Sequence, residues 1–310
     1  MRKIVGIGET VLDIVFRDDQ PTAAIPGGST FNALISLGRT VGHRFPEVPV
    51  LMVTETGDDH VSDIVTSFMT ANGVSTSAVT RNKGTQTHIS LAFLDENNDA
   101  QYEFYKDHAK ASLQEDKISG VTFEKGDLVL FGSYFAINPK IRNFTRQLLE
   151  NAHDACSLLY YDINFRKSHL ADLSDTISNI EENCRLSNIV RGSADDFGYL
   201  FGTSDPEEVY HEHIAHLCRT FICTCGDGPV HVFTPLLHLT FPVEKIETVS
   251  TIGAGDNFNA GLLYAFLQNG IECVEYMTAA QWTDMVSIAV KFSSNVCRSI
   301  FNYVDKDFVV

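Results

Sequence analysis

Positively charged residues are scarce in this chain of 310 residues. It contains 23 lysines and arginines against 40 aspartates and glutamates, which gives a formal net charge of −17. Nucleic acids and anionic membranes bind to basic surfaces, so the composition argues against both as partners. The overall field also repels a triphosphate, which would therefore have to be held locally by helix ends, a few basic side chains and a metal ion.

The chain also lacks long apolar runs, a cysteine framework and the common nucleotide motifs. No stretch approaches the roughly 18 apolar residues of a membrane helix, and the first residues lead straight into an expected strand, so we expect a cytoplasmic protein. The seven cysteines are an odd number, and Cys223 and Cys225 have no second pair for a zinc site, so we expect reduced thiols. There is no G-x-x-x-x-G-K-[ST] loop, and Val11 stands where a dinucleotide fingerprint beginning at Gly6 and Gly8 needs its third glycine.

Short apolar runs alternate with longer helical patterns along the whole chain. This alternation is typical of a mostly parallel sheet covered by helices on both faces, and we expect a single α/β domain over residues 1–310. The expected strands are 3–7, 48–54, 128–131, 158–162, 188–191, 220–224 and 230–233. The expected helices include 31–40, 61–72, 141–152, 206–218, 256–269 and 274–294.

One segment departs from this alternation. Residues 87–94 alternate with period two, residues 95–99 supply turn residues, and residues 100–105 return as a second strand. The pattern predicts an antiparallel hairpin inserted in an α/β chain. On the residues alone, an ordinary edge hairpin is the simplest interpretation.

The most informative segment is a glycine-rich turn that leads into a helix. Gly253, Ala254 and Gly255 precede Asp256 and an apolar helical run. The first turn of a helix leaves its N–H groups unpaired and carries partial positive charge, so it stabilises a phosphate or a developing oxyanion. Small residues would let a ligand oxygen approach this backbone closely.

Two interpretations of Asp256 remain open at this point. An aspartate at a helix start is ordinarily an N-cap, which accepts hydrogen bonds from the first N–H groups. Alternatively, its carboxylate accepts the proton of a substrate hydroxyl group while the backbone holds the charge of a phosphoryl group. A plain cap does not need two glycines and an alanine before it, and this favours the second interpretation.

A second glycine pair lies near the other end of the chain. Gly27 and Gly28 precede an expected short helix with Asn32 in its first turn. The pair is either a simple turn before a helix or a backbone that passes close to a polyhydroxylated ligand. In the second case Asn32 offers both donor and acceptor atoms to hydroxyl groups.

With both glycine elements, the chain resembles the PfkB/ribokinase family of carbohydrate and nucleoside kinases over essentially all 310 residues. The matching segments, in the order of the family, are 4–13, 27–32, 55–59, 162–166 (Asp-Ile-Asn-Phe-Arg), 224–228 (Thr-Cys-Gly-Asp-Gly) and 253–256 (Gly-Ala-Gly-Asp). The last glycine of the fifth segment stands one residue early. Each motif is weak alone, but six in the right order are specific.

The resemblance implies a ribokinase-like fold and an ATP-dependent kinase. The fold would have a mostly parallel central sheet and a small antiparallel β lid, formed near residues 11–26 and 86–106, that covers the sugar and often pairs with a second subunit. The activity would be transfer of the γ-phosphoryl group to a primary hydroxyl group of a small carbohydrate, most simply fructose or a related hexose. A lid would exclude water that competes with the sugar hydroxyl group.

The resemblance also implies roles for individual residues. The catalytic base would be Asp256, with an anion hole formed by Gly253, Ala254 and Gly255. The sugar would be held by residues matching Asp13, Gly28, Asn32, Asn164 and Arg166. The nucleotide would be held by residues matching Ser193, Thr224, Gly226, Gly228 and Thr251.

Three positions depart from the family pattern. Ser250 replaces the usual aspartate beside a monovalent cation, so we do not expect strong potassium activation. Ser193 and Asp196 stand in place of an Asn-x-x-Glu element that organises the water shell of Mg²⁺, and we expect Asp196 to act through water. The alternative is that Asp195 and Asp196 form a solvated helix start. Residues 291–299 lack the glycine usually found near the adenine, so its contacts are not assigned.

Other functions remain open. A nucleoside kinase would need aromatic faces, and Phe16, Phe93, Tyr102 and Phe104 of the expected lid offer them, although they also suit the apolar face of a hairpin. Arg166 would suit a sugar acid of the 2-keto-3-deoxygluconate type. The third alternative, from another class, is a non-catalytic protein that senses a sugar.

Overall fold

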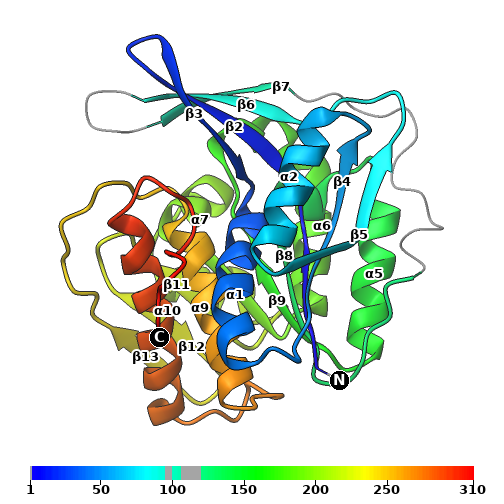
Figure 1. Ribbon diagram of the computed structural model, residues 1–310. Helices are drawn as coiled ribbons and strands as arrows, with labels where there is room; N and C mark the ends of the chain where they lie inside the picture. Colours follow the sequence, from blue (N-terminus) through cyan, green and yellow to red (C-terminus); the bar gives the residue numbers. More distant parts are fainter. Residues whose placement is uncertain (1, 95–99, 106–119) are drawn as a thin grey trace.

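The computed structural model describes residues 2–94, 100–105 and 120–310, and within them the strands form two sheets. Figure 1 shows the large sheet in the middle of the molecule and the small sheet across the top. In the large sheet the strand order is β13-β12-β11-β10-β9-β8-β1-β4-β5. Neighbouring strands are parallel, except that β12 is antiparallel to both β11 and β13. Its strands are β1 (Ile4–Ile7), β4 (Val50–Gly57), β5 (Val74–Asn82), β8 (Leu128–Gly132), β9 (Leu158–Asp162), β10 (Ile189–Ser193), β11 (Phe221–Thr224), β12 (Val230–Phe233) and β13 (His238–Phe241).

Helices cover both faces of this sheet. In Figure 1, α1, α9 and α10 stand together on one side, and α5 and α6 stand on the other. The helices are α1 (Ser29–Arg44), α2 (His60–Ala71), α4 (Ser133–Ile137), α5 (Arg142–Asp154), α6 (Leu173–Leu186), α7 (Ala194–Phe201), α8 (Pro206–Glu208), α9 (Ala254–Gln268) and α10 (Ala279–Cys297), with a 3-10 turn at Lys167–Asp172 and a π-helical turn at Val209–Ile214. In the described part of the chain, none of these helices is long and apolar enough to cross a bilayer.

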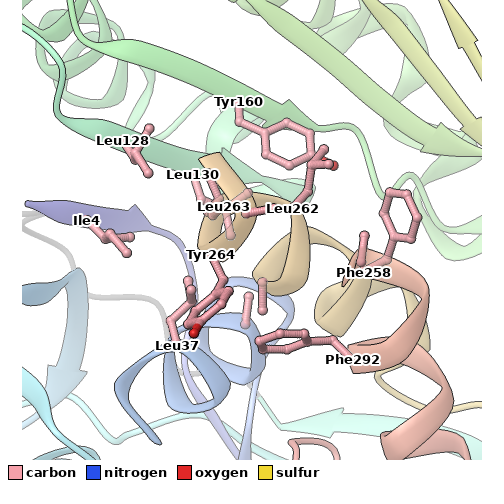
Figure 2. Close-up of a cluster of buried hydrophobic side chains, with 14 of the residues drawn as sticks. Ile4, Leu37, Leu128, Leu130, Tyr160, Phe258, Leu262, Leu263, Tyr264 and Phe292 are labelled. Atoms are coloured by element: carbon pink, nitrogen blue, oxygen red, sulfur yellow. The ribbon is translucent and has the colours of Figure 1, made fainter. Parts of the chain in front are cut away.

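The core is divided by the sheet into two apolar clusters, one on each face. Helix α9 lies at the centre of the first cluster, and every residue from Asn257 to Leu267 is buried. A helix that is apolar on all sides belongs in the middle of a fold, and α9 packs between the sheet, α1 and α10. Figure 2 shows side chains of α9 meeting those of β1, β8, β9, α1 and α10 in this cluster.

The small sheet has the strand order β3-β2-β6-β7. Its strands are β2 (Val11–Arg17), β3 (Gln20–Gly27), β6 (Ile89–Leu94) and β7 (Ala100–Tyr105). The predicted hairpin is confirmed as the antiparallel pair β6–β7, and parallel pairing of β2 with β6 joins it to the β2–β3 hairpin. The predicted turn at 95–99 and the predicted lid end at residue 106 lie outside the described residues.

All seven predicted strands of the large sheet are present, with ends shifted by at most three residues. Two further strands, β5 and β13, were not predicted. They form the two edges of the sheet, where alternating exposed positions carry polar residues such as Ser75, Ser77, His238 and Thr240 and interrupt the apolar run. The pattern that identified the central strands depends on burial of both faces, which an edge strand lacks.

Two predicted helices were wrong in extent. The helix expected from residue 274 begins at Ala279, because Thr278 and Gln281 form a capping box that fixes its start. The helix expected over 206–218 is a three-residue α-helical turn, α8, followed by the π-helical turn that ends at Ile214.

Truncation of a core side chain on α9 should destabilise the fold. Leu263 is fully buried, so Leu263→Ala leaves a cavity between α9 and the sheet and should lower the free energy of unfolding by about 2–5 kcal/mol. Leu236→Ala is the matched control, because that side chain is 77% exposed and its loss should change stability by less than about 0.5 kcal/mol. Urea denaturation measures both values, and equal midpoints for the two variants would contradict the described packing.

Candidate active site

The predicted site residues gather at one edge of the large sheet. Strands β9, β10 and β11 are parallel, so the loops that follow them lie side by side at their carboxyl ends. Residues 162–166, 193–196 and 224–228 occupy these three ends. Ligands of open α/β sheets bind in the crevice outside the carboxyl ends of the strands, so a ligand-binding site is expected at this edge.

The glycine-rich turn presents free backbone amides at the start of α9. Gly253 is the N-cap residue in a left-handed conformation (φ 80°), and no side chain caps this helix. Within the described chain, Ala254 donates to Thr251 and Asn257 donates to Gly253, while the amides of Gly255 and Asp256 have no acceptor. The turn therefore offers two adjacent N–H groups at the positive end of a helix dipole.

The N-cap interpretation of Asp256 was wrong. Asp256 lies in the first turn of α9, and its carboxylate turns away from this helix toward the first turn of α1. Ser29 Oγ donates to Asp256 Oδ1 at 2.7 Å, and Asn32 Nδ2 donates to Asp256 Oδ2 at 2.9 Å. The predicted base, which follows the glycine-rich turn of α9, is thus held by two residues that follow the Gly27–Gly28 pair. Asn32 is 224 residues and Ser29 is 227 residues away from it in sequence.

The surroundings of Asp256 raise the pKa of its carboxyl group above the ordinary value. Burial is the main cause, and the charge of Asp162 adds to it, whereas hydrogen bonds from Asn32 and Ser29 and the charge of Arg166 lower the pKa. A raised pKa makes the carboxylate a better proton acceptor near neutral pH. The structure therefore gives this carboxyl group the electrostatics of a general base.

Side-chain amides hold the turn in place. Asn257 Nδ2 donates to the carbonyl groups of Gly253 and Asn302, both at 2.8 Å. Ser36 of α1 donates to Asn257 Oδ1, so this amide also ties α9 to α1. Ser250 Oγ accepts a hydrogen bond from the Ile252 amide at 3.2 Å, which fixes the backbone just before the glycine-rich turn. Sequence reasoning assigned no role to Asn257.

The two glycines of the turn make room for protein groups. A Cβ atom at position 255 would lie 2.9 Å and 3.0 Å from the two terminal nitrogens of the Arg191 guanidinium. A Cβ atom at position 253 would lie 2.9 Å from the Asn302 carbonyl oxygen. The space beside each Cα is therefore filled by protein groups, and the approach of a ligand oxygen to the backbone N–H groups of this turn stays a prediction.

The other glycine pair has the same explanation. A Cβ atom at position 27 would lie 2.6 Å from Asp13 Oδ2, and one at position 28 would lie 2.3 Å from the Glu9 carbonyl oxygen. Gly28 also has φ 122°, where a side chain is strained, and it is the N-cap residue of α1. The pair lets α1 begin directly against the β1–β2 loop and the Asp13 carboxylate.

Asp13 is buried on β2, where Ser90 of β6 donates a hydrogen bond to its carboxylate. Burial raises the pKa of Asp13 to about 6, although the Ser90 hydrogen bond opposes the shift. Asn32 is also buried, and its Oδ1 atom has no hydrogen-bond partner in the described chain. A buried acceptor without a partner is costly, and a ligand hydroxyl group would satisfy it.

The segment after β9 carries three candidate residues. Asp162 is buried and accepts hydrogen bonds from Arg191 Nη1 at 3.0 Å and from Asn259 Nδ2 at 2.7 Å. Asn164 has a left-handed backbone (φ 39°), and its amide donates to Ser133 Oγ at 2.9 Å. Arg166 is exposed, yet near enough to lower the pKa of Asp256.

Ser193 and Asp196 form a reciprocal capping box at the start of α7. Asp196 Oδ2 accepts hydrogen bonds from the Ser193 amide and hydroxyl, both at 2.7 Å. Asp195 is exposed as the solvated interpretation expects, but Asp196 is only 6% exposed, so that interpretation was wrong for Asp196. Burial raises the pKa of the Asp196 carboxyl group, and so does the charge of Asp162, against hydrogen bonds from Ser193.

The nucleotide-side residues occupy a hairpin turn and a loop. Thr224 ends β11, and its Oγ1 atom accepts a hydrogen bond from Arg191 Nη2 at 2.6 Å. Gly226 (φ 62°) and Gly228 lie in the turn between β11 and antiparallel β12, where the Gly228 amide donates to Cys225 at 2.8 Å. Thr251 is exposed before the α9 turn.

The structure thus joins some predicted residues directly and leaves others near them. Asp256 contacts Asn32, while Thr224, Gly255 and Asp162 all contact Arg191. Two important residues, Ser29 and Arg191, were missed. The signal for Ser29 was its spacing of three residues from Asn32 in a first helical turn. The signal for Arg191 was an arginine within the otherwise apolar strand β10.

The site suits a magnesium ion held through water. In the part of the chain that the structure describes, no cluster of three or more His, Cys, Asp or Glu side chains could bind a metal directly. Mg²⁺ usually keeps several waters and takes one or two carboxylates together with substrate phosphates. Asp196 fits this role, because its Oδ1 atom accepts no hydrogen bond within the described residues.

Comparison with known proteins adds independent information. The model of the pfkB family carbohydrate kinases matches residues 1–300. A fructokinase of Rhizobium leguminosarum bv. trifolii is 25% identical over 266 residues, which cover 84% of this chain and 78% of that protein. Fructokinase-1 of Zea mays is 24% identical over 280 residues, which cover 86% and 83%.

Solved structures share the fold. Aminoimidazole riboside kinase from Salmonella enterica, complexed with aminoimidazole riboside and an ATP analog, has a TM-score of 0.83 at 19% identity over 99% of this chain and 97% of that chain. Fructokinase from Vibrio cholerae O395, in a form with fructose, ADP and calcium ion bound, has a TM-score of 0.83 at 20% identity over 97% and 94%. The predicted ribokinase-like fold is confirmed.

Asp13 should make the free energy of unfolding depend on pH. Its carboxyl group titrates near pH 6 when folded and near 3.8 when unfolded, so between these values the folded state binds more protons and stability falls as pH rises. The loss is at most about 3 kcal/mol between pH 4 and pH 7, and Asp13→Asn should abolish it. Urea denaturation of both proteins across this range measures the difference.

Asp284→Asn is the control for this measurement, because Asp284 is exposed on α10 and should leave the wild-type profile unchanged. Parallel profiles of the wild type and Asp13→Asn would show that the Asp13 carboxyl group titrates normally.

Proposed function

Because the chain belongs to the pfkB family of carbohydrate kinases, we propose that it transfers the γ-phosphoryl group of ATP to a primary hydroxyl group of fructose or a related hexose. The observation that carries this proposal is the start of α9. There the first turn of α9 carries both the Asp256 carboxylate, which is held by Ser29 and Asn32, and the unpaired amides of Gly255 and Asp256. The first group accepts a proton and the others hold phosphoryl oxygens, which are the two requirements of the reaction.

In the proposed step, Asp256 accepts the proton of the sugar hydroxyl group as its oxygen forms a bond to the γ-phosphorus. The bond between the γ-phosphorus and the β–γ bridging oxygen breaks, and ADP leaves with that oxygen. The amides of Gly255 and Asp256, with the backbone of Gly253 and Ala254, hold the charge on the transferring group. Asn32 and Ser29 keep the carboxylate oriented for in-line attack.

The sugar would be bound between α1, β2 and the end of β9. The unpartnered Oδ1 atom of Asn32 and the Asp13 carboxylate accept hydrogen bonds from sugar hydroxyl groups, and the Asn164 amide contributes donors. Gly28 shapes the backbone beside them, and Arg166 lies at the exposed side. Support for these assignments comes from the hydrogen bond of Asn32 to Asp256 and from the effect of the Arg166 charge on the pKa of Asp256.

The nucleotide would lie over the ends of β10 and β11, at Ser193, Thr224, Gly226, Gly228 and Thr251. Mg²⁺, when bound, neutralises phosphate charge, and Asp196 would hold its water shell. Ser250 uses its hydroxyl oxygen to close the preceding turn and carries no charge, so a monovalent cation has no carboxylate at this position. Strong potassium activation is therefore not part of the proposal.

The four-stranded sheet would act as a lid over the sugar and, in a homodimer, as the contact between subunits. Asp13 belongs to this sheet, where Ser90 holds its carboxylate, so a role in sugar binding would link the position of the lid to the sugar. We place the enzyme in the cytoplasm, where its seven free cysteines would stay reduced. Nucleic acid and membrane are not among the proposed partners.

The aromatic residues of the small sheet favour a sugar over a nucleoside. Phe16 and Phe93 stack on each other with ring centroids 5.0 Å apart, so each already has a partner. Phe104 is 53% exposed on edge strand β7, and the side chain of Tyr102 lies outside the described residues. Of these four residues, the one described ring pair, Phe16 with Phe93, is stacked on itself and does not enclose a base.

The function is tested by ADP release in a coupled assay across hexoses, 2-keto-3-deoxygluconate and nucleosides. We expect turnover with fructose or another hexose. Turnover confined to nucleosides or to the sugar acid would replace the proposed substrate class. Tight sugar binding in calorimetry without turnover of any compound would instead show a sensor and reject the kinase proposal.

Loss of the proposed base should reduce turnover strongly. Asp256→Asn keeps the shape of the side chain but removes the proton acceptor, so kcat should fall by about 10² to 10⁴-fold while the affinities for sugar and ATP change little. Initial rates and calorimetry measure these quantities. Asp284→Asn, at an exposed position of α10, is the control with wild-type kcat. Normal turnover of Asp256→Asn would remove Asp256 from the mechanism.

A further inference from the structure

A buried arginine lies directly behind the amides of the α9 turn. Arg191 is 5% exposed in the middle of β10, and its terminal nitrogens fill the space where a Cβ atom of residue 255 would lie. Its guanidinium carbon lies 5.9 Å from the ring centroid of Phe258, one turn further along α9. The side chain therefore places a full positive charge beneath the backbone that would receive the phosphoryl group.

The same guanidinium joins three segments that sequence reasoning assigned to the site separately. Nη1 donates to Asp162 at the end of β9, and Nη2 donates to Thr224 at the end of β11, while the group packs on Gly255. Its Nε atom is buried and has no partner within the described residues. Arg191 is thus the common contact of the sugar-side strand, the nucleotide-side hairpin and the anion-binding turn.

Stability alone gives a poor reason for this arrangement. Removing a guanidinium and a carboxylate from water is costly, and buried ion pairs often add less stability than apolar residues of similar size. Burial lowers the pKa of Arg191, but the negative charges of Asp162 and Asp196 raise it by more, so the net pKa lies above the ordinary value and the guanidinium stays charged. The chain has a net charge of −17, so its overall field repels a phosphate group. A fixed positive charge at this place would offset that repulsion, which explains the buried arginine better than packing does.

We propose that Arg191 is a positioning residue for phosphoryl transfer, which supplies the fixed positive charge of the anion hole through the Gly255 turn and aligns Thr224 with it. This inference rests on the proposed function, since it concerns the same site. Its action differs from that of Asp256, because Arg191 neither accepts a proton nor contacts the sugar. Its effect is therefore on charge that builds up at the transferring group.

The test compares Arg191→Met and Arg191→Lys. Methionine removes the charge, and kcat should fall by about 10² to 10³-fold with the KM for sugar unchanged. Lysine keeps the charge but lacks the planar fork that reaches Asp162 and Thr224 together, and we expect it to recover kcat to within about tenfold of wild type. A merely structural clamp would leave the lysine and methionine variants equally impaired, and that result would overturn the proposal.

Arg142 offers a matched control. It is also a buried arginine with an unpartnered Nε atom, but it pairs with Glu182 and Asn183 at the contact of α5 and α6 on the other face of the sheet. Arg142→Met should lower the melting temperature while kcat stays at the wild-type value. An equal loss of kcat in Arg142→Met and Arg191→Met at matched stability would assign the Arg191 effect to folding and overturn the proposal.

A binding measurement separates this inference from the proposed function. ADP with aluminium fluoride imitates the transferring phosphoryl group, and calorimetry should show at least tenfold weaker binding of it to Arg191→Met, with ADP alone bound as by wild type. Unchanged binding of the fluoride complex would reject the role of Arg191 even if sugars are phosphorylated. A wild type that binds the fluoride complex but phosphorylates no sugar would reject the substrate and leave the role of Arg191 supported.

Discussion

The contact between Asp256 and the first turn of α1 is the interaction on which the whole site depends. It joins two helix starts that are more than 220 residues apart in the chain, and it does so through both oxygens of one carboxylate. Each helix follows a glycine N-cap with positive φ, and neither start has a side-chain cap within the described residues. The Asp256 carboxylate is not used to cap α9, and Asn257 repeats the connection one residue further on through Ser36.

The central architecture could be predicted from the sequence because its signal is strong. Strands such as β8 and β9 are buried along their whole length and read as short apolar runs, and α9 is apolar on every side. The edge strands β5 and β13 could not be predicted in this way, because exposed polar residues interrupt their apolar pattern. The start of α10 depended on a Thr-Gln capping box that competed with an apolar pattern beginning earlier.

The sequence predicted the site residues that lie in recognisable motifs. It missed residues whose role depends on contacts that form only in the folded chain. Asp256, Asn32 and Asp13 follow recognisable motifs, and the structure brings the first two together. The purpose of the glycines could not be read from the sequence, because it depends on which distant group fills the space beside each Cα. Arg191 stands in a strand without a motif, and only the folded chain shows that its guanidinium reaches Asp162, Thr224 and Gly255.

The missing side chain at position 255 has a consequence for how this protein can change over generations. Because the guanidinium of residue 191 occupies the volume that a methyl group at position 255 would need, the facing side chain restricts the glycine, whereas the glycine does not restrict the facing side chain in return. The same holds for Gly27 and the carboxylate of Asp13. A lineage can therefore shorten either facing side chain on its own, but alanine at either glycine requires that side chain to move or to be replaced.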